Sequence, residues 1–185
     1  NDDGIDAEGM HALARRARTL GHEVVIVAPN FDASGTGASL GALSRQESVV
    51  FKTHRVEDFD GEAYSINGPP ALCVILSHLE AFGSVPDLVL SGINPGLNTG
   101  RSTLHSGTVG AVLTAQNFGS KGIAVSLHSE DAILPWFWDS AADAAETCIG
   151  VIEKAEPKTV LNVNVPALPT NSIKGLKWAR LAPFG

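Results

Sequence analysis

Apolar and polar residues follow two periods along this chain, and together they predict alternating helices and strands. Residues 8–20 place apolar side chains on one helical face and arginines on the other, and Gly21 follows as a helix stop. The run at 24–28 is short and wholly apolar, which is typical of a strand buried on both faces of a parallel sheet. The pattern predicts further helices at 70–82, 109–118 and 136–155, and further strands at 48–56, 87–90, 123–127 and 160–165.

This alternation predicts an α/β fold with a doubly wound, mostly parallel sheet. The 185 residues suit one domain, 1–185, with a sizeable core. Ligands of such sheets bind beyond the carboxyl ends of the strands. We therefore expect three polar stretches, at 1–4, 33–39 and 91–100, to meet at one edge of the sheet.

The stretch Asn1-Asp2-Asp3-Gly4 sets two carboxylates side by side just before a helix. Adjacent acids repel, so a buried junction tolerates them best when a cation lies between them. A hard divalent ion such as Mg²⁺ or Mn²⁺ takes oxygen ligands, and the hydroxyl of Ser34 and the amide oxygen of Asn94 could complete the set. The alternative is a solvated turn with an Asp cap, a turn hydroxyl and an Asn-Pro turn.

Ser106-Gly107-Thr108 opens the helix predicted at 109–118. The exposed N–H groups and the positive end of a helix N-terminus bind phosphate, although an ordinary Ser/Thr cap has the same sequence pattern. His105 could serve as a general acid for a leaving alkoxide, or be an exposed loop histidine.

Composition narrows the classes of function. The net charge of −7 argues against a nucleic-acid surface, and an anionic substrate would need a metal or local amides to offset it. Cys73 and Cys148 lie in apolar helical patterns and are predicted to be buried thiols in a reducing, cytoplasmic compartment. No stretch of eighteen apolar residues exists, so we expect no membrane span.

One other catalytic motif is present. Residues 37–41 match G-x-S-x-G with Ser39 as the nucleophile, which keeps a serine hydrolase as an alternative, although the preceding strand ends well before the serine. There is no Gly-Lys dipeptide, H-E-x-x-H or C-x-x-C, so a P-loop and these metal or redox motifs are excluded.

Six stretches of the chain, taken together and in order, resemble the SurE family of survival-protein nucleotidases: 1–5, 27–29, 34–37, 91–100, 105–109 and 161–166. The resemblance implies a Rossmann-like, three-layer α/β/α domain that hydrolyses nucleoside 5′- and 3′-monophosphates, and often polyphosphate, with one divalent ion (Mg²⁺ or Mn²⁺) per subunit. It identifies Asp2, Asp3, Ser34 and Asn94 as metal ligands, and Asp2 and Asp3 also as catalytic residues that act on the attacking water. It further identifies Ser106, Gly107 and Thr108 as a phosphate cradle, with Asn98 lining the same rim.

The resemblance also implies a short apolar strand before Asn1 and a swapped arm after residue 185 that builds homodimers and homotetramers. The residues give the first expectation independently, because two acids on a free terminus cannot be positioned accurately. Residues 68–73 read G-P-P-A-L-C where the family commonly has G-T-P-A-D-C, which leaves base preference open. A non-catalytic nucleotide-binding domain on the same fold is the remaining alternative.

Overall fold

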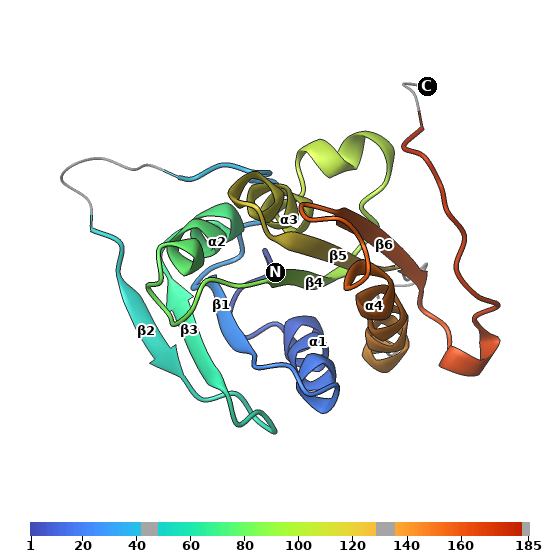
Figure 1. Ribbon diagram of the computed structural model, residues 1–185, viewed down its shortest axis with the longest axis horizontal. Coiled ribbons are helices and arrows are strands. Elements are labelled where there is room, and N and C mark those ends of the chain that lie inside the picture. The colour runs from blue at the N-terminus through green and yellow to red at the C-terminus, as the bar shows by residue number, and fades with distance from the viewer. Residues whose placement is uncertain (42–47, 129–135, 183–185) are drawn as a thin grey trace.

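The computed structural model describes residues 1–41, 48–128 and 136–182 as alternating strands and helices (Figure 1). Two short 3₁₀ helices, η1 and η2, accompany them. In chain order the elements are α1 (Glu8–Thr19), β1 (Val25–Pro29), β2 (Phe51–His54), β3 (Glu62–Ile66), α2 (Pro70–His78), β4 (Leu88–Pro95), η1 (Gly100–Leu104), α3 (Gly107–Phe118), β5 (Lys121–His128), α4 (Trp138–Ile152), β6 (Val160–Pro166) and η2 (Thr170–Ser172).

The strands form two sheets between two layers of helices. Among the described residues, one sheet has the order β1-β3-β2 and the other β4-β5-β6, and only the β2–β3 pair is antiparallel. Helices α1 and α4 cover one side, and α2 and α3 cover the other (Figure 1). The α/β class, the mostly parallel pairing and the three-layer α/β/α arrangement are thus confirmed, whereas the strands divide into two sheets.

Several predicted boundaries differ from the structure. β4 runs on through Pro95 because Asn94 pairs with Ser126 of β5, although 91–94 was predicted as loop. β3 was not predicted because its apolar alternation is weak, and β1 and β2 hold it from both sides. α2 ends at His78 and α4 begins at Trp138, so both are shorter than predicted.

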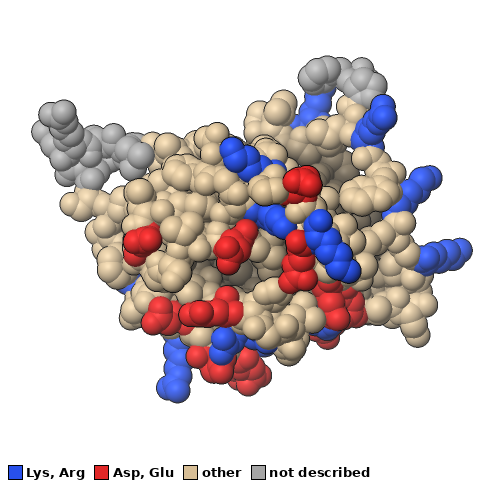
Figure 2. Space-filling view, viewed as in Figure 1, with Lys and Arg blue, Asp and Glu red and all other residues tan. Residues whose placement is uncertain are grey.

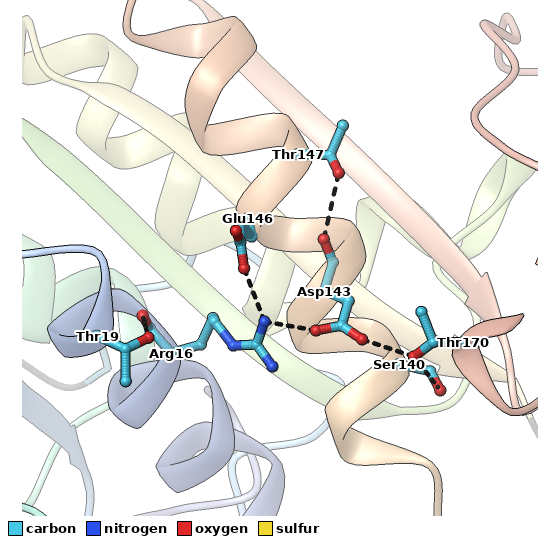
Figure 3. A network of polar contacts seen from close by, with 7 residues as sticks. All are labelled: Arg16, Thr19, Ser140, Asp143, Glu146, Thr147 and Thr170. Carbon is cyan, nitrogen blue, oxygen red and sulfur yellow. Dashed lines mark hydrogen bonds and ion pairs between the residues drawn. The ribbon is translucent and has the colours of Figure 1, made fainter.

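A polar network joins α1, α4 and the segment after β6 (Figure 3). Arg16 of α1 contacts the carboxylates of Asp143 at 2.5 Å and Glu146 at 2.7 Å, both on α4. Thr170 donates its hydroxyl hydrogen to the other oxygen of Asp143 at 2.6 Å. The hydrogen bond to Glu146 is the main reason that the pKa of Arg16 is raised.

Replacing Arg16 by Met should lower the free energy of unfolding by about 1 kcal/mol, since the pair is only partly shielded from water. The Arg16 side chain is 27% exposed. Urea titration of the two proteins measures the difference. Arg18→Met is the matched control, because its partner Asp60 is 82% exposed and the pair should contribute little. Equal losses in both variants would contradict this account of the network.

A groove of about 520 Å³ separates the two sheets. Apolar residues of α1, α2, β1 and β4 line it, and Asn1 lies at its wall. Among the described residues, β1 pairs only with β3 and β4 only with β5. The strand predicted ahead of Asn1 lies outside this sequence and stays a prediction, but this lining is what a strand buried on both faces requires.

The remaining predictions from composition can be compared with the structure. Cys73 and Cys148 are both buried and unpaired, as predicted, and burial raises the pKa of Cys73 to about 12. No helix in the described ranges is long and apolar enough to cross a bilayer. On the face shown in Figure 2, basic and acidic side chains are interspersed over the centre, and basic side chains alone lie along the right-hand rim.

Candidate metal and phosphate site

The three polar stretches meet at one edge, as the topology predicted. The backbone N–H of Ala33, next to Ser34, donates to the carbonyl of Asp2 at 2.7 Å. The side-chain amide of Asn1 donates to the carbonyl of Ile93 at 3.3 Å, and Ile93 precedes Asn94. The acidic stretch therefore lies between the other two loops and contacts a neighbour of each predicted ligand.

The N-terminus of α3 holds the Asp2 carboxylate. The Gly107 N–H donates to Oδ2 at 3.0 Å and the Thr108 hydroxyl to Oδ1 at 2.6 Å. Asp2 is 4% exposed and Thr108 is fully buried, so the carboxylate has little freedom to move. The positive end of the helix also stabilises its charge.

This geometry changes the interpretation of the predicted phosphate cradle. Two of its three donors are already bonded to Asp2, and Ser106 caps α3 by accepting the N–H of Val109 at 3.1 Å. The structure thus brings Ser106, Gly107 and Thr108 to the acidic stretch. Their contact with a phosphate stays a prediction.

Asp3 is an unfavourably placed carboxylate in the protein alone. Burial raises its pKa, and the charge of Asp2 raises it further, while a hydrogen bond from Asn1 at 2.6 Å opposes these effects. Asp32 adds a third negative charge nearby. A bound cation would relieve this repulsion, which is the first test that a metal fits here.

The loop that carries Ser34 contains a carboxylate that sequence analysis missed. Asp32 accepts the backbone N–H of Ser34 at 2.9 Å. A hydrogen bond from the Ser34 side chain, followed by this backbone bond, lowers the pKa of Asp32. The spacing of two residues is that of an Asx turn and was the available signal.

Asn94 has its carboxamide oriented by the loop that follows β4. Its Nδ2 donates to the carbonyl of Gly96 at 2.7 Å, and the Gly96 N–H donates to the carbonyl of Leu127 at 3.0 Å. Its Oδ1 accepts no hydrogen bond from the part of the chain that the structure describes. That oxygen is therefore available as a ligand, which is the second test of fit.

The donor chemistry is that of a hard cation. Within 1–41, 48–128 and 136–182, no three His, Cys, Asp or Glu side chains gather closely enough to hold a metal alone. An ion at Asp2 and Asp3 must therefore complete its shell with uncharged oxygens, such as those of Ser34 and Asn94, and with water. Mg²⁺ and Mn²⁺ accept such a set.

Other predicted residues lie around the same edge. Asn98 is 5% exposed, and its Nδ2 donates to the hydroxyl of Ser126 at 2.9 Å, so only its Oδ1 is left for the predicted substrate contact. His105 is exposed, and its carbonyl accepts the N–H of Gly37 at 3.0 Å. Its role as a general acid stays a prediction.

The loop containing Ser39 packs closely on α3. A Cβ at Gly110 would come within 2.4 Å of the Gly37 carbonyl oxygen, so only glycine allows this approach. The described residues 30–41 contain no helix, and Ser39 is exposed in the loop. The strand–turn–helix context of a hydrolase nucleophile is thus not found at Ser39.

Comparison with known proteins identifies the family. The family model described as "Survival protein SurE" matches residues 1–183. The chain is 39% identical over 184 residues to "5′-nucleotidase SurE" of Stenotrophomonas maltophilia (strain R551-3), and 39% identical over 186 residues to that of Xanthomonas euvesicatoria pv. vesicatoria (strain 85-10). Each alignment covers 98% of this chain and 67% of the relative.

A solved structure shares the fold. The crystal structure of the SurE protein from Aquifex aeolicus superposes with a TM-score of 0.77 at 36% sequence identity, over 96% of this chain and 68% of that one. The family match spans nearly the whole sequence and includes every residue that forms the edge described above. The chain belongs to the SurE family.

Proposed function

We propose that this chain is a metal-dependent phosphomonoesterase that hydrolyses nucleoside 5′-monophosphates to nucleoside and phosphate. The observation that carries the proposal is the pair of adjacent carboxylates: the N-terminus of α3 fixes Asp2, and Asp3 is partly buried beside the charge of Asp2. Relatives with 39% identity carry the name 5′-nucleotidase SurE, which supports the same substrate class. Because the site would recognise a phosphoryl group, we extend the proposal to 3′-monophosphates and polyphosphate.

Asp2, Asp3, Ser34 and Asn94 would hold one divalent ion, Mg²⁺ or Mn²⁺. When bound, such an ion supplies positive charge that offsets the charge of the phosphoryl group and makes a water molecule more acidic. Among the described residues, the protein contributes the fixed orientation of Asp2 and the Oδ1 of Asn94, which accepts no hydrogen bond.

The two aspartates have different environments, which separates their roles. Both oxygens of Asp2 accept hydrogen bonds from α3, so Asp2 is a fixed charge. Asp3 accepts only the Asn1 amide, at Oδ2, among the described residues. Its Oδ1 can therefore orient the attacking water and accept its proton. The positive end of α3 favours an anionic substrate at this edge.

Chelation tests the metal requirement. With Mn²⁺ or Mg²⁺ present, the chain should release inorganic phosphate from AMP, and EDTA should abolish the release, because the repelling carboxylates alone cannot bind a phosphate dianion. Adding the ion back in excess should restore activity, which controls for denaturation. Phosphate release that continues under EDTA would overturn the proposal.

A further inference from the structure

A row of polar side chains crosses the β4-β5-β6 sheet at its ligand-binding edge. The register places Asn94 of β4 opposite Ser126 of β5, and Ser126 opposite Asn164 of β6. Central positions of parallel strands are usually apolar, so three polar residues in one row need a reason. Asn98, in the loop that returns over these strands, provides the hydrogen-bond partners of two of them, Ser126 and Asn164.

The side chain of Asn164 forms two hydrogen bonds with the backbone of Asn98, one to its N–H and one to its carbonyl, as a neighbouring strand would. Its Oδ1 accepts the Asn98 N–H at 2.9 Å, and its Nδ2 donates to the Asn98 carbonyl at 3.1 Å. Asn162 donates to the same carbonyl at 2.8 Å, and Ser126 accepts from the Asn98 side chain at 2.9 Å. Every group of Asn98 except its side-chain oxygen is thus engaged, at a residue that is 5% exposed.

These contacts fix one end of the loop that begins at Asn94. The other end is held by β5, through the pairing of Asn94 with Ser126 and the bond from Gly96 to Leu127. The Asn94 carboxamide is oriented by the carbonyl of Gly96. The Gly96 N–H is held by β5, but the Gly96 carbonyl belongs to the next peptide group, which leads through Leu97 to Asn98. A shift at Asn98 would therefore turn this carbonyl and, with it, the Asn94 carboxamide.

We propose that Asn164 is a positioning residue for the metal site: by clamping Asn98 it sets the direction of the Asn94 oxygen. The side chain of Asn164 forms hydrogen bonds only with Asn98 among the described residues. The inference rests on the proposed function, in which Asn94 is a ligand. Partners of this kind, one step removed from an ion, commonly control its affinity.

Three variants of the full chain test the inference. Asn164→Leu removes both bonds to Asn98, whereas Asn162→Leu, the matched control, removes one of two donors to a carbonyl that stays bonded. We expect Mn²⁺ affinity, measured by calorimetric titration, to fall about 10-fold in Asn164→Leu and to change little in Asn162→Leu. Turnover of AMP at limiting Mn²⁺ should fall in parallel and recover at saturating Mn²⁺, which a general loss of folding would not allow.

Each outcome decides the question. Wild-type Mn²⁺ affinity in Asn164→Leu overturns the inference, as does an equal loss in Asn162→Leu. If Asn164→Leu does not fold, Asn164→Asp retains the acceptor for the Asn98 N–H, and an affinity between those of wild type and no binding supports the inference while an unchanged affinity overturns it. A wild-type chain that binds Mn²⁺ but releases no phosphate from AMP sinks only the proposed function. A wild-type chain that binds no Mn²⁺ overturns the inference.

Discussion

Replacing Asp3 by Asn should lower AMP turnover by about 100-fold or more, the usual contribution of a positioned base, while raising the melting temperature of the metal-free protein. The two effects have one cause. Burial and the charge of Asp2 raise the pKa of Asp3, so its ionised form is unfavourable in the folded chain. Asn keeps the shape of the side chain and removes the charge. Calorimetric melting and a phosphate-release assay measure the two effects.

The difference in stability between wild type and Asp3→Asn should depend on pH. Folded Asp3 binds its proton more tightly than the unfolded residue, whose pKa is near 3.8. Wild type therefore loses stability relative to Asp3→Asn as pH rises from that value through the raised folded pKa, and the gap is constant above it. Asp6→Asn, which removes a carboxylate at an exposed position of the same segment, is the matched control. A melting temperature that falls in Asp3→Asn would contradict this account.

The same variant separates an enzyme from the alternative of a non-catalytic nucleotide-binding domain. An enzyme should lose turnover far more than it loses affinity for AMP. A binding domain should release no phosphate in either form. Equilibrium binding of AMP to wild type and to Asp3→Asn, measured alongside phosphate release, distinguishes the two.

Replacing Gly107 by Ala should lower both stability and AMP turnover, because the added Cβ would displace the Asp2 carboxylate. A Cβ there would lie 2.8 Å from the Cβ of Asp2 and 3.0 Å from its Oδ2, and Asp2 is too buried to move aside. We expect a loss of about 1–3 kcal/mol in stability from overpacking and a fall of about 100-fold in turnover from displacing the carboxylate. Urea titration and phosphate release from AMP measure the two losses.

Gly150→Ala on α4 is the matched control. A Cβ at Gly150 would meet nothing within 4 Å, so alanine should stabilise this helix by about 1 kcal/mol. Turnover should not change, since Gly150 is exposed on α4 and belongs to none of the loops at the site. Wild-type turnover in Gly107→Ala would show that α3 does not position Asp2.

The sequence was sufficient for features that depend on local pattern and topology. Apolar periods located α1, β1, α3 and β5 within two residues of their observed bounds. The rule that ligands gather at the carboxyl ends of parallel strands then brought Asp2 near Ser34 and Asn94. Pairing between distant segments has no such local signal, and so β3 and the division into two sheets were missed.

Within the site, the sequence was not sufficient to predict what the N-terminus of α3 binds. A helix N-terminus binds any anion, and the sequence cannot show whether that anion is a substrate phosphate or the protein's own carboxylate. Here the Gly107 and Thr108 donors bind Asp2. Asn162 and Asn164 were noted as part of a motif, but their role depends on a loop returning from 64 and 66 residues away.

The groove between β1 and β4 has the apolar lining that a strand buried on both faces requires. Among the described residues, the edges of β1 and β4 that border it are unpaired, and each can form backbone hydrogen bonds with an added strand. A strand bound there would join the two sheets into one continuous sheet, with α1 covering one face of that strand and α2 the other. The loops at the carboxyl ends of β1 and β4 would then be linked through the added strand. A strand bound in this groove should therefore make the ligand-binding edge of the sheet more rigid.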